Sequence, residues 1–160
     1  MGRATQGVRG IQLRDNDKIA GMVVTRRDAM LCTVTEQGFA KRTRLDEYPL
    51  QRRGGVGTTT VEISKKTGLL VGVKEILVAD EVMLVTVSGA AHRVPAGKIP
   101  VQSRLTQGKR MIDLEKKDRV VEVARVAPEE ESSNPVAYES DEEEDLALPA
   151  QLELIASAGE

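Results

Sequence analysis

The segment Arg3-Ala4-Thr5-Gln6-Gly7-Val8-Arg9 decides the fold, because its pattern returns later in the chain. It reappears at 104–110 as Arg-Leu-Thr-Gln-Gly-Lys-Arg, and Gln-Arg-Arg-Gly-Gly-Val-Gly at 51–57 stands midway between the two. Gly57 follows Gly7 by 50 positions, and Gly108 follows Gly57 by 51. A further landmark keeps similar spacing, since residues 30–35 parallel residues 83–88 at 53 positions. Self-similarity at a nearly constant period predicts a protein built from repeated structural units.

Each unit has the pattern of strands, with short runs of β-branched residues broken by Gly, Asp, Asn or Lys clusters. The expected strands are 11–13, 18–25, 29–35 and 40–45 in the first unit, 58–64, 69–76, 81–88 and 90–95 in the second, and 111–114 and 119–126 in the third. About four strands per fifty residues are typical of a propeller blade. The sequence therefore predicts an all-β, propeller-like domain over residues 1–127 with about two and a half blades. Closed propellers need roughly four to eight blades, so we expect a fragment of a larger protein, the alternative being an incomplete arc with exposed edge strands.

Charge divides the chain into a basic body and an acidic tail. Residues 1–127 hold all 23 lysines and arginines against 14 acidic residues, whereas residues 128–160 hold 11 acidic residues and no basic one. A positive body of this size is expected to attract a polyanion, and nucleic acid is the commonest one in a cell. With no Trp, one Phe and two Tyr, the chain lacks the stacking platforms of single-strand readers.

Other functional classes find little support in the residues. A single Cys and a single His exclude a disulfide framework and a Cys/His zinc site. No apolar stretch approaches the roughly 20 residues of a membrane span, and residues 1–20 contain no secretory signal, so we expect a soluble cytoplasmic protein. No nucleophile and base set, phosphate loop or paired carboxylates for magnesium are present, and we expect no catalysis by this chain.

The glycine-rich segment at 51–57 is the strongest candidate site. Its three glycines allow a tight turn whose N–H groups approach a partner closely, and Arg52 and Arg53 supply forked donors that match phosphate. Taken alone, the segment is equally well explained as a solvated connection between blades. It also resembles the gyrase A box, whose pattern is Gln, basic, Arg, Gly, Gly, basic, Gly, at six of seven positions.

The surrounding residues are also similar to the C-terminal domain of the DNA gyrase A subunit. The similar stretches are Gly38-Phe39-Ala40-Lys41-Arg42-Thr43, Asp46-Glu47-Tyr48, the Thr-Gln-Gly repeats and Asp118-Arg119-Val120-Val121 before the acidic tail. The resemblance covers residues 2–127. Val56 departs from the box pattern, and the box does not stand in an opening blade, which leaves open whether it is the principal box or a box-like repeat.

The resemblance implies a β-pinwheel, a propeller-like disc that exchanges strands between blades and bends duplex DNA around its basic rim. It implies a role in ATP-dependent negative supercoiling, with the rest of gyrase A and gyrase B as partners, and with ATP and magnesium used by other parts of the holoenzyme. The DNA-contacting residues expected on this basis are Gln51, Arg52, Arg53, Gly54, Gly55, Gly57, Arg3, Arg9, Lys41, Arg42, Arg44, Arg104, Lys109 and Arg110. Strand alternation places Lys41 on one face and Arg42 with Arg44 on the other, so we expect only one face to meet DNA.

Two other functions for the folded part, and two roles for the tail, are also open. The same fold would serve the A subunit of topoisomerase IV, although the box favours gyrase, or a protein-binding propeller that recognises an acidic partner. The tail at 128–160 is predicted to be disordered, because so charged a segment cannot bury enough apolar surface. It is either a solubilising end or a tethered mimic of DNA that occupies the basic rim.

Overall fold

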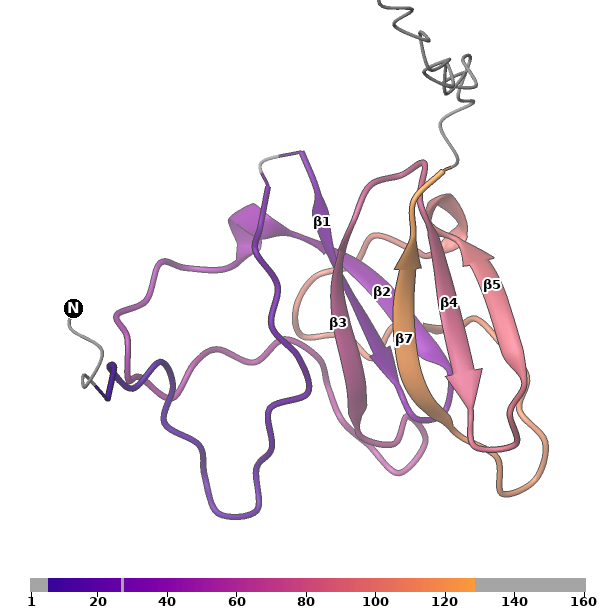
Figure 1. Cartoon of the computed structure of the whole chain (residues 1–160), viewed down its shortest axis with the longest axis horizontal. Coiled ribbons are helices and arrows are strands. Elements are labelled where there is room, and N and C mark those ends of the chain that lie inside the picture. The colour runs from indigo at the N-terminus through magenta and orange to yellow at the C-terminus, as the bar shows by residue number, and fades with distance from the viewer. Residues whose placement is uncertain (1–5, 27, 129–160) are drawn as a thin grey trace, which may run out of the picture. The chain divides into compact units, whose positions relative to one another are not determined.

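The computed structural model describes residues 6–26 and 28–128, and within them the chain forms two antiparallel sheets and two short 3₁₀ helices (Figure 1). Arg3 and the acidic tail lie outside the described residues, as do the predictions of tail disorder and of tail binding to the rim. The all-β prediction is confirmed. No helix among the described residues is long and apolar enough to cross a membrane.

The first blade is a sheet of four strands in the order β3-β1-β2-β6. The hairpin of β1 (Met30–Thr35) and β2 (Phe39–Arg44) forms its centre, β3 (Leu70–Ile76) pairs with β1, and β6 (Lys109–Arg110) pairs with β2. The strand β6 follows the second hairpin in the chain yet completes the first blade, so the first blade receives a strand from a later part of the chain.

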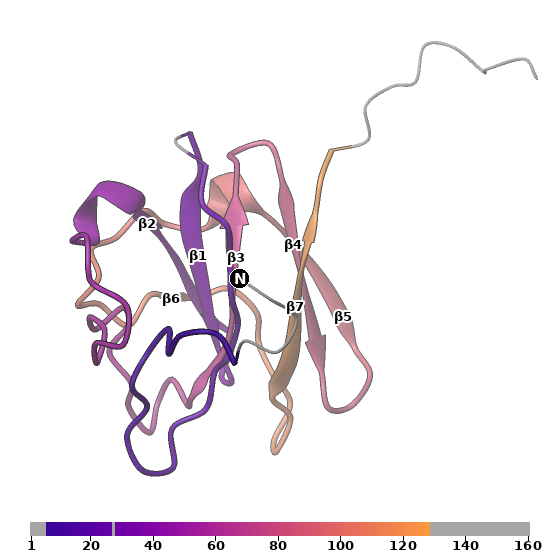
Figure 2. The same ribbon diagram turned by 60° about the vertical axis from the view of Figure 1, so that its left-hand side comes forward.

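The second blade repeats this plan with three strands in the order β5-β4-β7. Its strands are β4 (Glu81–Thr86), β5 (Ala91–Pro95) and β7 (Val120–Val126). Each hairpin is followed by a 3₁₀ helix, η1 (Leu45–Glu47) after β2 and η2 (Ala96–Lys98) after β5. Figure 2 shows the two sheets side by side, with β3 of one facing β7 of the other.

The registers of the two hairpins define the repeat. Met30 pairs with Arg44 as Glu81 pairs with Pro95, an offset of 51 positions, and both blades carry a register shift at the same point, Val34/Thr35 and Val85/Thr86. The spacing of 53 between the methionine-led segments is therefore two residues longer than the structural repeat. Met30 and Met83 are therefore not equivalent, although their neighbours look alike. The positions that are equivalent in the two blades are the bulge and the turn glycines Gly38 and Gly89, which are 51 residues apart.

Four expected strands are not strands in the structure: 11–13, 18–25, 58–64 and 111–114 contain at most isolated bridges. A strand needs a hydrogen-bonded neighbour, and for most of these residues the structure describes no neighbour in the plane of a sheet. Residues 20–22 instead lie flat on β3, where a Cβ on Gly21 would stand 3.1 Å from Val73. Gly72 of β3 meets Val123 of β7 in the same way at 3.2 Å, so the segment stacks on β3 as β3 stacks on β7.

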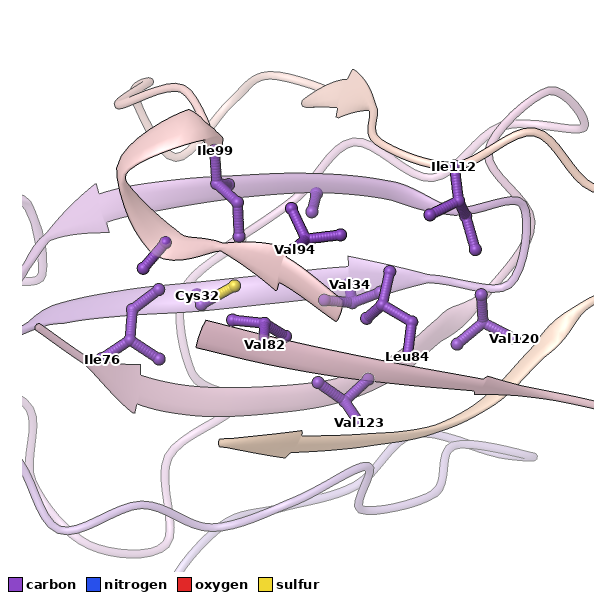
Figure 3. Packing of buried hydrophobic residues seen from close by; sticks show 12 residues of the cluster. Cys32, Val34, Ile76, Val82, Leu84, Val94, Ile99, Ile112, Val120 and Val123 are labelled. Atoms are coloured by element: carbon purple, nitrogen blue, oxygen red, sulfur yellow. The ribbon is translucent and has the colours of Figure 1, made fainter. Parts of the chain in front are cut away.

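The core lies between the two sheets and is aliphatic, as the composition requires. Figure 3 shows Cys32 and Val34 of β1 facing Val82 and Leu84 of β4, with Ile99 and Ile112 closing the ends. Alternate residues of β4 are buried, the period of a strand with one face on the core. Burial also raises the pKa of the Cys32 thiol to about 12, so this cysteine is a buried apolar residue, as expected.

Candidate nucleic-acid interface

Residues 51–57, here named the box loop, form an exposed turn around a hollow of about 440 Å³ that only these residues line. Gln51, Arg52 and Arg53 are exposed. Gly54 and Gly57 have φ of +76° and +80°, a conformation that side chains other than glycine rarely adopt. Two of the three glycines of the pattern, Gly54 and Gly57, are therefore required by the backbone, in a turn whose two guanidinium groups lie in solvent.

The three copies of the glycine pattern, at 3–9, 51–57 and 104–110, are here called the first, second and third corners. The described part of the first corner lies beside the box loop. The N–H of Gly54 donates to the Gly10 carbonyl at 2.9 Å, and the N–H of Gln12 donates to the Gly55 carbonyl at 2.8 Å. This pairing brings exposed Arg9, one of the DNA contacts that the resemblance implies, next to the box loop. In Figure 1 the two segments run together as the indigo and magenta loops at the left of the sheets.

Arg104 of the third corner binds the segment that follows the box loop. Its Nη1 donates to the Thr59 carbonyl at 2.9 Å, and its guanidinium lies 5.7 Å from the centre of the Tyr48 ring. The N–H of Glu62 donates to the Thr106 carbonyl at 3.3 Å. The Tyr48 ring therefore packs under this arginine.

The three landmark glycines share one backbone conformation. Gly7, Gly57 and Gly108 have φ of +78°, +80° and +83°. This conformation agrees with the repeat inferred from the sequence, but it is not specific to these corners, since Gly38, Gly54, Gly68 and Gly89 also have positive φ. Lys109 and Arg110, directly after Gly108, are exposed on β6.

Most of the predicted cations at these corners are free of carboxylate partners. Within residues 6–26 and 28–128, the ion pairs found involve none of Arg9, Arg52, Arg53, Lys109 and Arg110. An unpaired surface cation keeps its full field for an incoming anion.

Arg44 differs, because its guanidinium forms a forked pair with Asp46 at 2.9 to 3.2 Å. That hydrogen bond to Arg44 holds the pKa of the Asp46 carboxyl below its usual value. A phosphate at Arg44 would have to compete with this carboxylate, so we leave Arg44 outside the core of the interface.

Two predicted DNA contacts lie in the interior. Lys41 is completely buried, and Arg42 is 7% exposed. Both were expected at the surface because alternation defines the two faces of a strand but does not reveal what covers them. Residues 97–106 run alongside β2, with a parallel bridge between Val101 and Arg42, and their carbonyl groups accept from both side chains. Neither side chain is therefore available to DNA in this structure, and neither is carried into the proposed interface.

Lys66 joins the exposed cations, although sequence reasoning did not single it out. Its ammonium lies 5.5 Å from the centre of the Phe39 ring, and the Arg110 guanidinium lies 5.3 Å from the same ring. Both distances are in the range of cation–π contacts, so two cations lie against the Phe39 ring at the β6 edge of the first blade. The sequence offers one signal, the Lys65-Lys66 pair, which predicts a turn but not the aromatic ring beside it.

No group of three or more His, Cys, Asp or Glu side chains that could hold a metal ion is found in the described part of the chain. His92, which occupies in β5 the place that Lys41 holds in β2, is half-buried.

Fold and site together define a class: a propeller-type repeat protein whose glycine-bearing corners present unpaired arginine and lysine side chains. The family model of the DNA gyrase C-terminal domain, described as a beta-propeller, matches residues 1–26, 29–76 and 80–127, one repeat after another. The chain belongs to the DNA gyrase C-terminal domain family.

Curated relatives agree with this assignment. The chain is 37% identical to the A subunit of DNA gyrase from Mycolicibacterium smegmatis over 88% of its length, and 40% identical to that from Streptomyces coelicolor over 79%. These matches cover only 17% and 15% of the two relatives, so the chain corresponds to a small part of such a protein.

Solved structures show the same fold. A structure of a DNA gyrase A C-terminal domain matches 79% of the chain with a TM-score of 0.71 and 29% identity, and the match covers 43% of that domain. The C-terminal domain of a DNA topoisomerase IV matches 76% of the chain with a TM-score of 0.69 at 24% identity, which supports the fold alone.

Proposed function

We propose that this chain binds duplex DNA without sequence preference and bends it along its corners, as the C-terminal part of a gyrase A subunit. The observation that carries the proposal is the box loop, in which Arg52 and Arg53 are exposed on a glycine turn that pairs with the Arg9 corner. Arginine suits phosphate because its planar fork matches two oxygens. Family membership makes DNA the expected polyanion.

Binding through phosphates explains why few aromatic side chains are needed. Guanidinium, ammonium and backbone N–H groups hold the sugar-phosphate backbone, and none of these contacts reads a base. Bending a short duplex costs about 1–6 kcal/mol, and each further corner that meets DNA offsets part of that cost. Three successive corners, at Arg9, Arg52 with Arg53, and Lys109 with Arg110, supply such contacts in series.

The remaining parts of the proposal concern the whole enzyme. The wrapped DNA would be presented to the breakage gate of a holoenzyme made with the rest of gyrase A and with gyrase B, in the bacterial cytoplasm. ATP and magnesium would act there, and the catalytic groups would be supplied there too. Wrapping by this chain would fix the handedness of strand passage and so support negative supercoiling.

The test measures duplex affinity of the chain against salt concentration. Counterion release predicts that log K falls linearly with log of the salt concentration, with a slope of about 0.9 per phosphate contacted. Replacing Arg52 and Arg53 by Ala is expected to lower that slope by about two units. The matched control replaces Arg26 and Arg93, which change net charge equally but are exposed and already paired with Glu75 and Glu81.

Equal slopes for the two double variants would contradict the assignment of the box loop. A topology assay addresses bending itself: relaxed plasmid is incubated with the chain and topoisomerase I, and the trapped linking number is measured. Wrapping traps supercoils of one sign, whereas a surface that merely coats DNA, or one that recognises an acidic protein, traps none.

A further inference from the structure

Lys41 carries a buried ammonium group in the first blade whose contacts are all on one turn. Its Nζ donates to the Ser103 carbonyl at 2.6 Å, to the Arg104 carbonyl at 2.7 Å and to the Thr106 hydroxyl at 3.3 Å. Three donors thus meet three acceptors. An ammonium group loses its hydration on burial at a cost of several kcal/mol, and such a group is kept only where its hydrogen bonds are fully satisfied.

The neighbouring side chains of β2 hold the same connection. The Arg42 Nε donates to the Ile99 carbonyl at 2.8 Å, and the Thr43 hydroxyl donates to the Gln102 carbonyl at 3.0 Å. Lys41 differs from these two because it reaches the end of the connection, where the chain turns toward the third corner. It is therefore the link between the interior of the blade and residues 103–106.

That turn is connected to the box loop. Arg104, whose carbonyl accepts from Lys41, donates from its guanidinium to the Thr59 carbonyl at 2.9 Å and from its N–H to Glu47 at 3.1 Å. Thr58, next to Thr59, accepts a hydrogen bond from Gln51 at the opposite end of the box loop. Hydrogen bonds and the covalent links between them thus connect Lys41, through Arg104, to the segment that leaves the box loop at Thr58 and Thr59 and from there to Gln51 at its start.

The second blade offers an internal comparison. His92 pairs with Leu84 as Lys41 pairs with Thr33, so the two residues are equivalent. The strand β5 is an edge of its sheet, and no described segment pairs with its outer side as residues 100–102 pair with β2. Lys41 thus occurs in the blade in which a turn lies against the lysine, whereas histidine occupies the equivalent position in the blade for which the structure describes no such turn.

We propose that Lys41 is a positioning residue for DNA binding: it does not touch DNA, but fixes the 103–106 turn and, through Arg104, the box loop. This inference rests on the proposed function of the box loop and deepens it. It also reverses the role expected of Lys41 from the sequence, since the charge acts on carbonyl groups of the protein instead of on phosphates.

The test uses the full chain with Lys41→Met, Lys41→Arg and the control Lys98→Met, which removes an exposed lysine from the same connection. Amide hydrogen exchange of residues 51–60 and 103–108 is measured without DNA, and duplex affinity is measured against salt. Lys41→Met is expected to speed exchange in both segments and to weaken binding about tenfold, the effect of losing one ordered charge-assisted contact. Lys41→Arg is expected to restore much of the affinity, and Lys98→Met to leave exchange in both segments unchanged.

A double-mutant cycle with Arg104→Ala separates positioning from direct contact. If Lys41 acts through Arg104, the losses of DNA affinity in the two single variants do not add in the double variant. A lysine that contacts phosphate gives additive losses, and additive losses would overturn the inference. Unchanged affinity in Lys41→Met, with faster exchange only at 103–108, would also overturn it and leave Lys41 a local support. Should Lys41→Met fail to fold, amide exchange of residues 51–60 in Arg104→Ala decides whether the two sites are coupled. Unchanged exchange in those residues would show that Arg104 does not order the box loop and would overturn the inference. Failure of the unmodified chain to show salt-dependent DNA binding would instead refute the proposed function, and the exchange experiment still decides whether Lys41 orders the box loop.

Discussion

Replacing Gly108 by Ala is expected to destabilise the fold strongly, while the same change at the equivalent Gly7 is expected to be mild. Both glycines have positive φ, at +83° and +78°, so each alanine meets the left-handed backbone cost of about 1–2 kcal/mol. At Gly108 the new Cβ would also stand 2.7 Å from the Ala40 carbonyl oxygen and 2.9 Å from its carbon. No described atom lies within 4 Å of the Cβ position at Gly7.

The contact at Gly108 cannot be relieved by a side-chain rotation, because both of its atoms belong to the backbone of β2. Overpacking of this kind costs about 1–3 kcal/mol, which gives a total of about 2–5 kcal/mol for Gly108→Ala against about 1–2 kcal/mol for Gly7→Ala. Urea unfolding of the full chain measures both. With slopes of about 1–3 kcal/mol per M, the midpoint should fall by about 0.7–5 M for Gly108→Ala and by about 0.3–2 M for Gly7→Ala, and at one common slope the first shift is about twice the second or more. Equal midpoints for the two variants would refute the close approach of the third corner to β2.

Further predictions concern buried groups. Because burial raises the pKa of Cys32 to about 12, its thiol should resist a disulfide reagent at about pH 8 in the native chain and react only after denaturation; reaction at the rate of a free thiol would contradict that burial. Asp80→Asn should cost about 3–5 kcal/mol, measured by urea unfolding, because the fully buried carboxylate accepts from Arg125 Nη2 at 3.1 Å and from the Leu77 N–H at 2.7 Å. The exposed pair of Arg44 and Asp46 offers the control, since solvent screens it and Asp46→Asn should leave the midpoint almost unchanged. The pKa of Lys41 falls from 10.5 to about 8 through burial, partly offset by Glu47 and assisted by Arg104. The unfolded chain therefore binds more protons between pH 8 and 10.5, so the free energy of unfolding contributed by this group should rise with pH in that window, and Lys41→Met should remove that rise.

Spacing alone predicts the elements that depend on local chemistry. The glycines at 7, 57 and 108 mark corners because only glycine adopts their backbone conformation without strain, so the requirement is written directly in the residues. The first strand of each hairpin is predictable for a similar reason, since a run with β-branched residues precedes the turn glycine, Gly38 in one blade and Gly89 in the other.

Features that depend on distant neighbours could not be predicted in the same way. Residues 18–25 have the composition of a strand, yet pairing is decided by what lies alongside, and the structure describes residues 20–22 stacked on β3. The surface role expected of Lys41 and Arg42 was wrong for the same reason, because the segment that covers them begins more than fifty residues later in the sequence. Arg9 was expected among the DNA contacts from the family resemblance, but the hydrogen bonds that bring it to the box loop were not predicted.

The pairing of β6 with β2 dictates an order of events during synthesis. The hairpin of the first blade emerges early, but its outer partner at 109–110 follows the whole second hairpin. An unfilled edge of this kind is open to wrong pairing until its partner arrives. The ribosome must therefore release both hairpins before either blade is complete, and the two blades should gain protection from proteolysis together and not one after the other.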